Sequence, residues 1–146
     1  MCGRFTLKTS KARIKEMFRL ERIGEFDPRY NIAPSQQVLA ARFEPDSGQR
    51  EGVMFKWGLI PVWAKDAKIG NSLANARADT VATKPAFRSA FKRRRCLVVA
   101  DGFYEWGKGE GGKIPYYFHM KDGSHSPLQG CGNGGTREKN RLNRVR

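Results

Sequence analysis

Apolar residues follow a helical period in two segments of the chain. Thr9 and Ser10 can cap a helix that begins at Lys11, and its apolar face consists of residues three and four positions apart. These residues are Ile14, Met17 and Phe18. Residues 83–92 show the same spacing around Phe87, and the proline in this segment is tolerated in a first turn. The pattern therefore predicts two short helices.

The other apolar segments are short and have the composition of strands. Their ranges are 38–43, 53–59, 96–100, 103–106 and 114–120. The last two are joined by a glycine-rich stretch, which predicts a hairpin. The segments expected to be loops and turns are 29–34, 44–51 and 65–70. The fold class that follows is α+β, mainly antiparallel β and barrel-like, with a few short helices.

The composition adds an excess of positive charge. The chain has 146 residues, enough for one domain, and a net charge of +14. This charge favours a polyanionic partner such as nucleic acid, although a basic protein without such a partner has the same composition. Residues 88–95 concentrate the charge alongside Phe87 and Phe91. No apolar run approaches the roughly 20 residues of a membrane span and no secretory signal follows Met1, so we expect a cytoplasmic monomer with no membrane partner.

Cysteines and histidines are too few and too scattered for a disulfide framework or a metal site. The three cysteines are Cys2, Cys96 and Cys131, and the two histidines are His119 and His125. Their spacing matches none of the ligand patterns known for zinc. We therefore expect no metal and no cofactor. Cys96 lies in an apolar run, which predicts a buried structural thiol.

The second residue, Cys2, carries the clearest chemical signal. Removal of the initiator methionine would leave an α-amine and a thiol on one residue. An α-amine has a pKa of about 7.7 to 8.0, so part of it is unprotonated near neutral pH and can form a Schiff base with an aldehyde. The thiol can then add to the imine carbon and close a five-membered thiazolidine ring. Position alone does not distinguish this role from that of an ordinary second residue.

Motifs further along the chain change that balance. Those that recur with Cys2 are Met1–Phe5 (MCGRF), 29–34 (RYNIAP), 57–61 (WGLIP), 75–80 (NARADT) and 95–106 (RCLVVADGFYEW). Each is weak alone, but in this order and spacing they resemble the SRAP family (SOS response-associated peptidase), also called abasic-site processing proteins. The resemblance extends over residues 1 to about 123.

The resemblance implies a partner and a reaction. Members of this family bind single-stranded DNA, or its junction with duplex, at an abasic site, where the opened deoxyribose carries an aldehyde. The N-terminal cysteine condenses with this aldehyde and forms a stable DNA–protein crosslink. The family also has an autopeptidase activity that removes the initiator methionine. By this resemblance, Cys2 is the expected nucleophile.

Two further residues are expected to be catalytic. Glu105 would move protons during imine formation, which suits a carboxylate that is partly shielded from water. Asn75 would orient the sugar or the amine through hydrogen bonds. The alternatives are a surface Glu105 paired with a lysine, and an Asn75 that stabilises its own turn.

Four more residues are expected to contact DNA. Arg4 and Arg77 would hold the phosphates beside the lesion, because a guanidinium matches phosphate oxygens. Trp63 and Pro34 would stack on bases or wedge between them. The alternatives are a salt bridge from Arg77 to Asp79 and core packing for both Trp63 and Pro34.

The character of the chain changes after Gly123. Residues 124–146 contain no aromatic side chain, whereas the preceding residues carry all of them. Codons for residues 129–135, read in a shifted frame, permit Gly-Leu-Trp-Glu-Arg-Trp, a segment of the kind found at this point in the family. We therefore interpret residues 1–123 as a partial SRAP domain lacking its C-terminal part, and 124–146 as an aberrant, disordered basic tail from a frameshift.

This interpretation has consequences for folding and catalysis. The family's catalytic histidine is expected beyond the break, and neither His119 nor His125 matches its motif. Missing strands would leave an unpaired edge and an uncovered core face. Since a domain's net stability is only about 5–15 kcal/mol, the chain is expected to fold poorly alone.

Two other functions remain open at this point. One is a non-catalytic remnant that binds single-stranded DNA through phosphates and stacking, with strong salt dependence and no covalent product. The other is an N-terminal-nucleophile glutamine amidotransferase, because such enzymes also begin Met-Cys-Gly. The arginines and the 75–77 segment favour DNA over glutamine.

Overall fold

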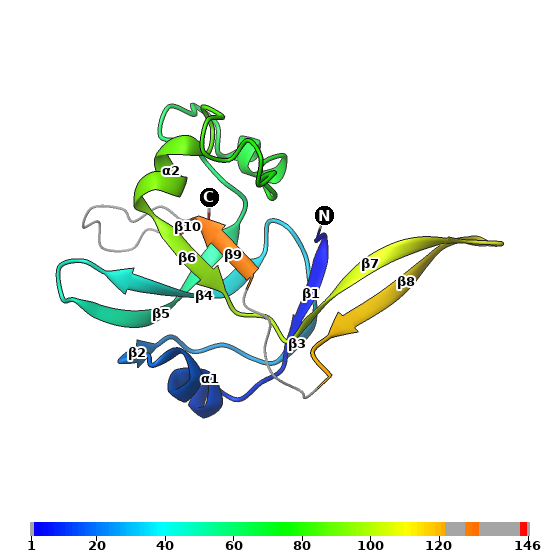
Figure 1. The fold of residues 1–146 in the computed structure, drawn as a ribbon, viewed down its shortest axis with the longest axis horizontal. Coiled ribbons are helices and arrows are strands. Elements are labelled where there is room, and N and C mark those ends of the chain that lie inside the picture. The colour runs from blue at the N-terminus through cyan, green and yellow to red at the C-terminus, as the bar shows by residue number, and fades with distance from the viewer. Residues whose placement is uncertain (1, 122–127, 132–143, 146) are drawn as a thin grey trace.

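The computed structural model describes residues 2–121, 128–131 and 144–145, and its strands form two sheets (Figure 1). The first has the order β3-β1-β7-β8 and contains β1 (Arg4–Leu7), β3 (Arg29–Ile32), β7 (Gly102–Gly109) and β8 (Gly112–His119). The second has the order β10-β5-β4-β6-β9 and contains β4 (Gln37–Glu44), β5 (Gln49–Trp57), β6 (Arg95–Val98), β9 (Leu128–Cys131) and β10 (Arg144–Val145), with β2 (Arg22–Ile23) also paired to β5. The mainly β class with short helices is confirmed, but the two sheets do not close into a barrel within the described residues.

The helices are α1 (Lys11–Phe18), the 3-10 helix η1 (Ala67–Asn71) and α2 (Arg88–Arg93). Helix α1 has the predicted start, because the Ser10 side chain accepts a hydrogen bond from the backbone N–H of Arg13 at 3.4 Å. Its predicted apolar face places Ile14 fully inside the core. Among the described residues, none of the helices has the length and apolar character needed to cross a bilayer.

Several predicted boundaries were wrong. Residues 29–34 were expected to form a loop, but Arg29–Ile32 is strand β3, which pairs with β1 and buries Ile32 while Tyr30 and Asn31 stay exposed. Pro34 ends this strand without preventing it. The expected loop at 65–70 contains η1, whose first turn is capped by Asp66 through the N–H of Lys68 at 2.8 Å.

Other elements are shorter or longer than expected. The helix expected over 83–92 begins only at Arg88, because the preceding residues form turns. Strands β4 and β5 extend into the segment expected to be a turn, where Glu44 and Gln49 pair. The predicted hairpin of β7 and β8 is confirmed, with Gly109 opposite Gly112.

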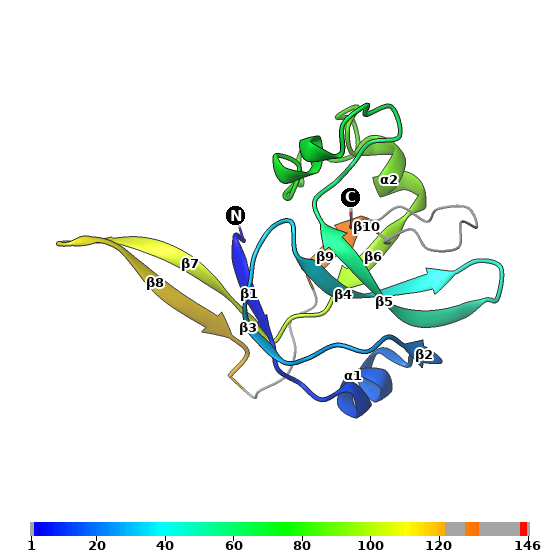
Figure 2. The same cartoon turned by 180° about the vertical axis from the view of Figure 1, so that it is seen from behind.

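One core joins most of these elements. It is built from β1, α1, β3, β4, β5 and β6, and its largest fully buried side chains include Phe5, Ile14, Leu39 and Phe55. Cys96 is buried in this core, as predicted. In contrast, the β7–β8 hairpin extends away from the body (Figure 2), and every residue of β8 is exposed. Its apolar side chains therefore remain in contact with solvent.

The tail lies mostly outside the described residues. Its two described strands are paired, β9 antiparallel with β6 and β10 parallel with β5. Strand β9 thus lies along one edge of β6. The disorder expected for the rest of 124–146 stays a prediction.

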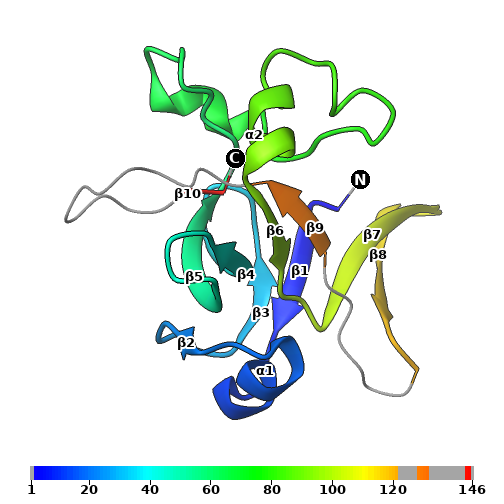
Figure 3. The ribbon, with the colours of Figure 1, turned by 60° about the vertical axis from the view of Figure 1, so that its left-hand side comes forward.

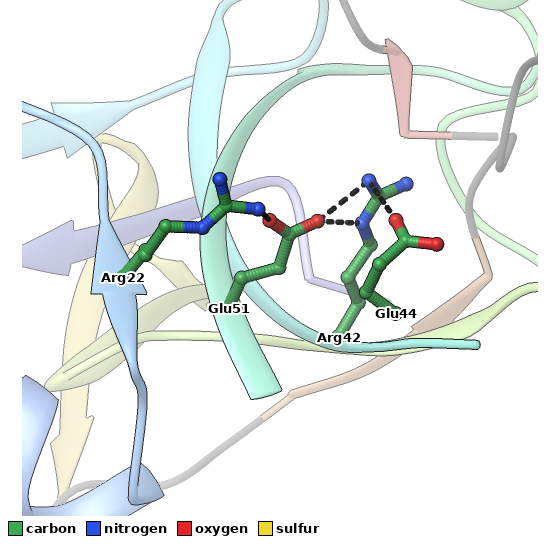
Figure 4. Close-up of polar contacts among 4 residues, drawn as sticks. All are labelled: Arg22, Arg42, Glu44 and Glu51. Carbon is green, nitrogen blue, oxygen red and sulfur yellow. Dashed lines mark hydrogen bonds and ion pairs between the residues drawn. The ribbon is translucent and has the colours of Figure 1, made fainter. Parts of the chain in front are cut away.

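A network of ion pairs crosses the second sheet (Figure 4). Glu51 of β5 is 7% exposed and accepts hydrogen bonds from Arg22 at 2.9 Å and from Arg42 Nε at 2.7 Å. Arg42 also contacts Glu44 at 2.9 Å. Because Glu51 has two cationic partners, the cost of removing its charge from water is offset. The network also links β2, β4 and β5.

We predict that Glu51→Gln destabilises the fold by about 2 kcal/mol, because it removes the carboxylate that pairs with Arg22 and one of the two carboxylates that pair with the partly buried Arg42. Urea unfolding followed by tryptophan fluorescence measures this change. The matched control is Glu16→Gln, which removes the exposed Arg13–Glu16 pair and should change the unfolding free energy by less than about 0.5 kcal/mol. Equal effects of both substitutions would contradict a stabilising role for the network.

Candidate functional site

Cys2 lies at the start of β1, the strand between β3 and β7. It is half-buried and packs against the main core, while its thiol donates a long hydrogen bond to the carbonyl oxygen of Arg4 at 3.5 Å. Strand β1 begins at the end of the molecule that carries α2 and the β5–α2 connection, and runs toward α1 (Figures 1 and 3). The central position of β1 therefore fixes the backbone that carries Cys2.

Asn75 lies beside Cys2 although the two are distant in sequence. Its side-chain N–H donates to the backbone carbonyl oxygen of Cys2 at 2.9 Å. The side-chain amide of Asn75 thus bonds to the backbone of Cys2 rather than to its own turn. Asn75 is also exposed to solvent.

Trp57 holds the segment that carries Asn75. Its indole N–H donates to the carbonyl oxygen of Ala74 at 2.9 Å, and its ring packs on Phe5 of β1 with centroids 5.2 Å apart. Leu59 adds a backbone hydrogen bond to Leu73 at 3.0 Å. One buried side chain thus fixes Asn75 relative to the strand that follows Cys2.

The same tryptophan also fixes the loop that contains Pro34. The backbone of Trp57 exchanges hydrogen bonds with Ser35 and Gln36, both at 2.8 Å. Ser35 has a φ of 73°, an unusual conformation for this residue, and its hydroxyl donates to Asn71 Oδ1 at 2.7 Å. Pro34 is half-buried within this constrained loop.

Gly58 allows η1 to approach the end of β5. A Cβ at this position would lie 2.4 Å from the carbonyl oxygen of Gly70, and its φ of 142° also disfavours other residues. No larger side chain fits without moving η1. This close approach sets the path of the chain toward Asn75.

Glu105 is half-buried on β7, the strand next to β1. Burial raises the pKa of the Cys2 thiol above its ordinary value, the hydrogen bond to Arg4 lowers it in part, and the negative charge of Glu105 raises it further. Glu105 is therefore close enough to Cys2 to act on it electrostatically. The structure brings together the three residues expected to be catalytic: Cys2, Asn75 and Glu105.

The two arginines expected to contact DNA have protein partners. Arg4 is half-buried and donates to Asn31 Oδ1 at 3.3 Å. Arg77 forms the alternative salt bridge with Asp79, with contacts of 2.9 to 3.3 Å, and this partner lowers the pKa of Asp79. The side chains of Arg77 and Asp79 are both exposed, so their ion pair contributes little to stability. A phosphate can therefore compete with Asp79 for the guanidinium of Arg77.

Core packing is excluded for Trp63. Its side chain is 59% exposed, next to Val62 at 73%. Two large apolar side chains in water at one turn are unusual and are available for stacking. Pro34 is half-buried, which is compatible both with core packing and with contact to a DNA base.

His119 does not join the site. His119 is exposed on β8, contacts the carbonyl oxygen of Met120 at 3.0 Å and stacks on Tyr117. His125 lies outside the described residues.

Sequence reasoning missed Asp101 as a positioning residue. Its carboxylate is buried and accepts hydrogen bonds from the N–H and hydroxyl of Thr9 at 3.2 and 2.8 Å and from the N–H of Lys8. Its own N–H donates to the carbonyl oxygen of Thr6 at 2.9 Å. Asp101 thereby joins the start of β7 to the end of β1. The sequence contains one signal for this role: Asp101 directly follows an apolar run. A carboxylate in such a position is buried and needs hydrogen-bond donors from the surrounding protein.

Comparisons with known proteins agree with this geometry. The sequence matches the profile of the family described as SOS response associated peptidase (SRAP) over residues 1–141. It is 46% identical to the abasic site processing protein YoaM of Bacillus subtilis, covering 83% of this chain and 54% of that protein. It is 32% identical to the abasic site processing protein HMCES of Gallus gallus, covering 88% of this chain and 45% of that protein. The chain thus spans about half the length of these relatives.

Solved structures give the same result for the fold. A crystal structure of a protein from Bacteroides thetaiotaomicron superposes with a TM-score of 0.76 at 25% identity, covering 89% of this chain and 59% of that one. A phage-related protein from Bordetella bronchiseptica gives a TM-score of 0.71 at 25% identity, covering 99% and 68%. The family match extends beyond residue 123, where the resemblance of the motifs ended. The chain belongs to the SOS response associated peptidase (SRAP) family, whose members include abasic site processing proteins.

Proposed function

We propose that this chain captures abasic sites in single-stranded DNA as a covalent crosslink through Cys2, after removal of Met1. The observation that carries the proposal is the gathering of Cys2, Asn75 and Glu105 at the start of β1. The relatives named as abasic site processing proteins suggest the substrate class. The net charge of +14 supports a polyanionic substrate.

The proposed reaction uses both groups of an N-terminal Cys2. The free amine attacks the aldehyde carbon of the opened deoxyribose and gives a carbinolamine, which loses water to form an imine. The thiol sulfur then adds to the imine carbon, and the thiol proton passes to the nitrogen. The products are one thiazolidine and one water molecule. The half-buried setting of the thiol keeps it close to the imine carbon.

Glu105 and Asn75 have separate roles in this scheme. Glu105 accepts a proton from the attacking amine and returns it to the departing hydroxyl, as a general base and acid near Cys2. Asn75 holds the Cys2 backbone through the 2.9 Å hydrogen bond to its carbonyl oxygen. This bond orients the amine toward the sugar without any proton transfer from the amide.

Removal of Met1 is proposed to be autocatalytic. The bond between Met1 and Cys2 is hydrolysed by one water molecule, and the Cys2 thiol is the nearest nucleophile. The same site would thus expose the amine that it later uses.

Four residues are proposed to hold the DNA around the lesion. Arg77 exchanges Asp79 for a phosphate, since an exposed ion pair is easily replaced by a charge-assisted contact of the same kind. Arg4 holds a second phosphate from β1. Trp63 stacks on an unpaired base, and the loop with Pro34 wedges beside it. The 59% exposure of Trp63 supports its part of this arrangement.

We predict that the Cys2 thiol is alkylated more slowly than that of an unstructured peptide at about pH 8, because its raised pKa keeps it protonated at this pH. The rate should increase as the pH rises further. Glu105→Gln removes a negative charge, lowers the pKa and should accelerate alkylation about two- to tenfold. The alkylation rate of Cys2 is measured on protein that retains Met1, by iodoacetamide pulses followed by peptide mapping with mass spectrometry. Glu110→Gln at the hairpin tip is the control, and an equal acceleration by both variants would contradict the proximity of Glu105.

We predict that protein lacking Met1 forms a stable crosslink with single-stranded DNA that carries one abasic site, seen as a shifted band on a denaturing gel. Cys2→Ala should remove this band, yet borohydride should still trap its Schiff base, because the terminal amine remains. Asn75→Ala should slow crosslinking at least about tenfold by misplacing the amine. Cys131→Ala should leave it unchanged. Tight binding without any crosslink would instead support a non-catalytic DNA-binding protein.

A further inference from the structure

We propose a further DNA contact, distinct from Cys2 and from the four residues proposed to hold the DNA around the lesion: a basic hollow beside α2 binds the phosphodiester backbone of the strand whose abasic site Cys2 captures. This inference rests on the proposed function and adds a lesion-independent site to it. It accounts for a cluster of cations that neither the fold nor the crosslinking chemistry uses.

The sequence around α2 carries charge of one sign only. No aspartate or glutamate occurs between Asp79 and Asp101, whereas six cations do. These are Lys84, Arg88, Lys92, Arg93, Arg94 and Arg95. The segment therefore supplies a large share of the net charge of +14 from a short stretch of chain.

The fold exposes two of these cations on one side of α2. Phe87 and Ala90, three positions apart, are buried and belong to a small cluster with Leu59. Arg88 and Lys92, four positions apart, consequently lie on the other face and are exposed. The amphipathic pattern of α2 thus presents its charge to solvent.

The exposed side is hollowed. The hollow, about 560 Å³ in volume, is lined by Ala82, Arg88, Ser89, Phe91, Lys92, Arg93 and Arg95. Four of these are cations, one is a hydroxyl donor, and none is acidic. Such a lining provides hydrogen-bond donors and positive charge at several points, as a chain of phosphates requires.

Several arginines outside the hollow pair with carboxylates, whereas the four cations that line it do not do so among the described residues. Arg22, Arg42 and Arg77 pair with carboxylates. Arg88, Lys92, Arg93 and Arg95 form no ion pair with any described residue. Mutual repulsion among them is therefore not offset within the described part of the chain, and an anionic ligand would relieve it.

A nucleic acid fits the hollow better than an acidic peptide does. Phe91 is half-buried in the lining and offers an apolar surface for a sugar or a base, a combination with cations that is typical of single-strand grooves. Helix α2 also lies at the end of the molecule where β1 begins (Figures 1 and 3). One strand can therefore contact α2 and extend toward Cys2.

The test is the salt dependence of binding to intact single-stranded DNA without a lesion. Fluorescence anisotropy over a series of salt concentrations gives the slope of log K against log salt, which is about −0.7 for each phosphate neutralised. Lys92→Gln/Arg93→Gln should reduce the slope by about 1 to 1.5 and weaken binding about tenfold at low salt. Lys92→Glu/Arg93→Glu should weaken it further. Urea unfolding of each variant verifies that the fold is retained.

The control removes the same charge from the opposite end of the molecule. Arg13→Gln/Lys15→Gln on α1 changes exposed residues and should leave the slope unchanged. An equal reduction by the α1 and α2 variants, or no reduction by either, would overturn the proposal. Tighter binding of poly-glutamate than of DNA would also overturn it and assign the hollow to an acidic protein.

This experiment is separable from the crosslinking reaction. If the proposed function fails, the wild-type protein gives no crosslink, yet the α2 variants still change the slope. If only the α2 contact fails, crosslinking proceeds and the slope is unaffected by the variants. When both hold, Lys92→Gln/Arg93→Gln raises the protein concentration needed for half-maximal crosslinking and leaves the rate at saturation unchanged.

Discussion

The candidate site depends on how the buried side chain of Trp57 joins three separate parts of the chain. Its ring packs on Phe5, its indole N–H holds Ala74, and its backbone holds the Ser35–Gln36 turn. Buried donors and acceptors are costly to leave unpaired, so each of these bonds constrains the segment at its other end. The result is that Asn75 and the Pro34 loop lie in fixed positions around the start of β1. Preorganisation of this kind is what a site needs before it can align a nucleophile with a carbon atom.

Charged residues divide into two groups by their partners. Glu51, Arg22 and Arg42 satisfy one another and link strands, so their charges serve the fold. The four cations that line the hollow beside α2 form no ion pair with a described residue, and Arg77 has only an exposed partner. A basic protein can therefore be stable and still keep a surface for a polyanion, provided that its buried charges pair internally.

Sequence patterns predicted what depends on local spacing. The cap at Ser10 and the apolar spacing around Ile14 predicted α1. Two apolar segments joined by a glycine-rich stretch predicted the β7–β8 hairpin. The motif resemblance predicted Cys2, Asn75 and Glu105 as site residues, and the fold places Asn75 and Glu105 near Cys2. By contrast, β3 was missed because Pro34 suggested a loop, while the pairing with β1 that makes it a strand involves residues far apart in sequence.

Long-range contacts explain the remaining differences. Nothing near Trp57 in the sequence indicates that its indole reaches Ala74, and nothing near Asp101 indicates that its acceptors meet Thr9. The salt bridge of Arg77 is instead a local contact, because Asp79 is only two residues away. It could therefore be predicted from the sequence as an alternative to DNA binding. The mainly β class followed from the sequence, but the division into two sheets did not, because it depends on how strands meet at their edges, which periodicity does not encode.

The most direct test of this account is the crosslinking rate of Trp57→Phe measured at saturating abasic DNA, with Trp63→Phe as the matched control. Phenylalanine keeps the packing on Phe5 but removes the N–H that holds Ala74. The account predicts that Trp57→Phe, while still folded by urea unfolding, loses at least about tenfold in rate because Asn75 is no longer held beside Cys2. It predicts that Trp63→Phe retains the wild-type rate at saturation. A folded Trp57→Phe variant that crosslinks as fast as the wild-type protein would contradict it.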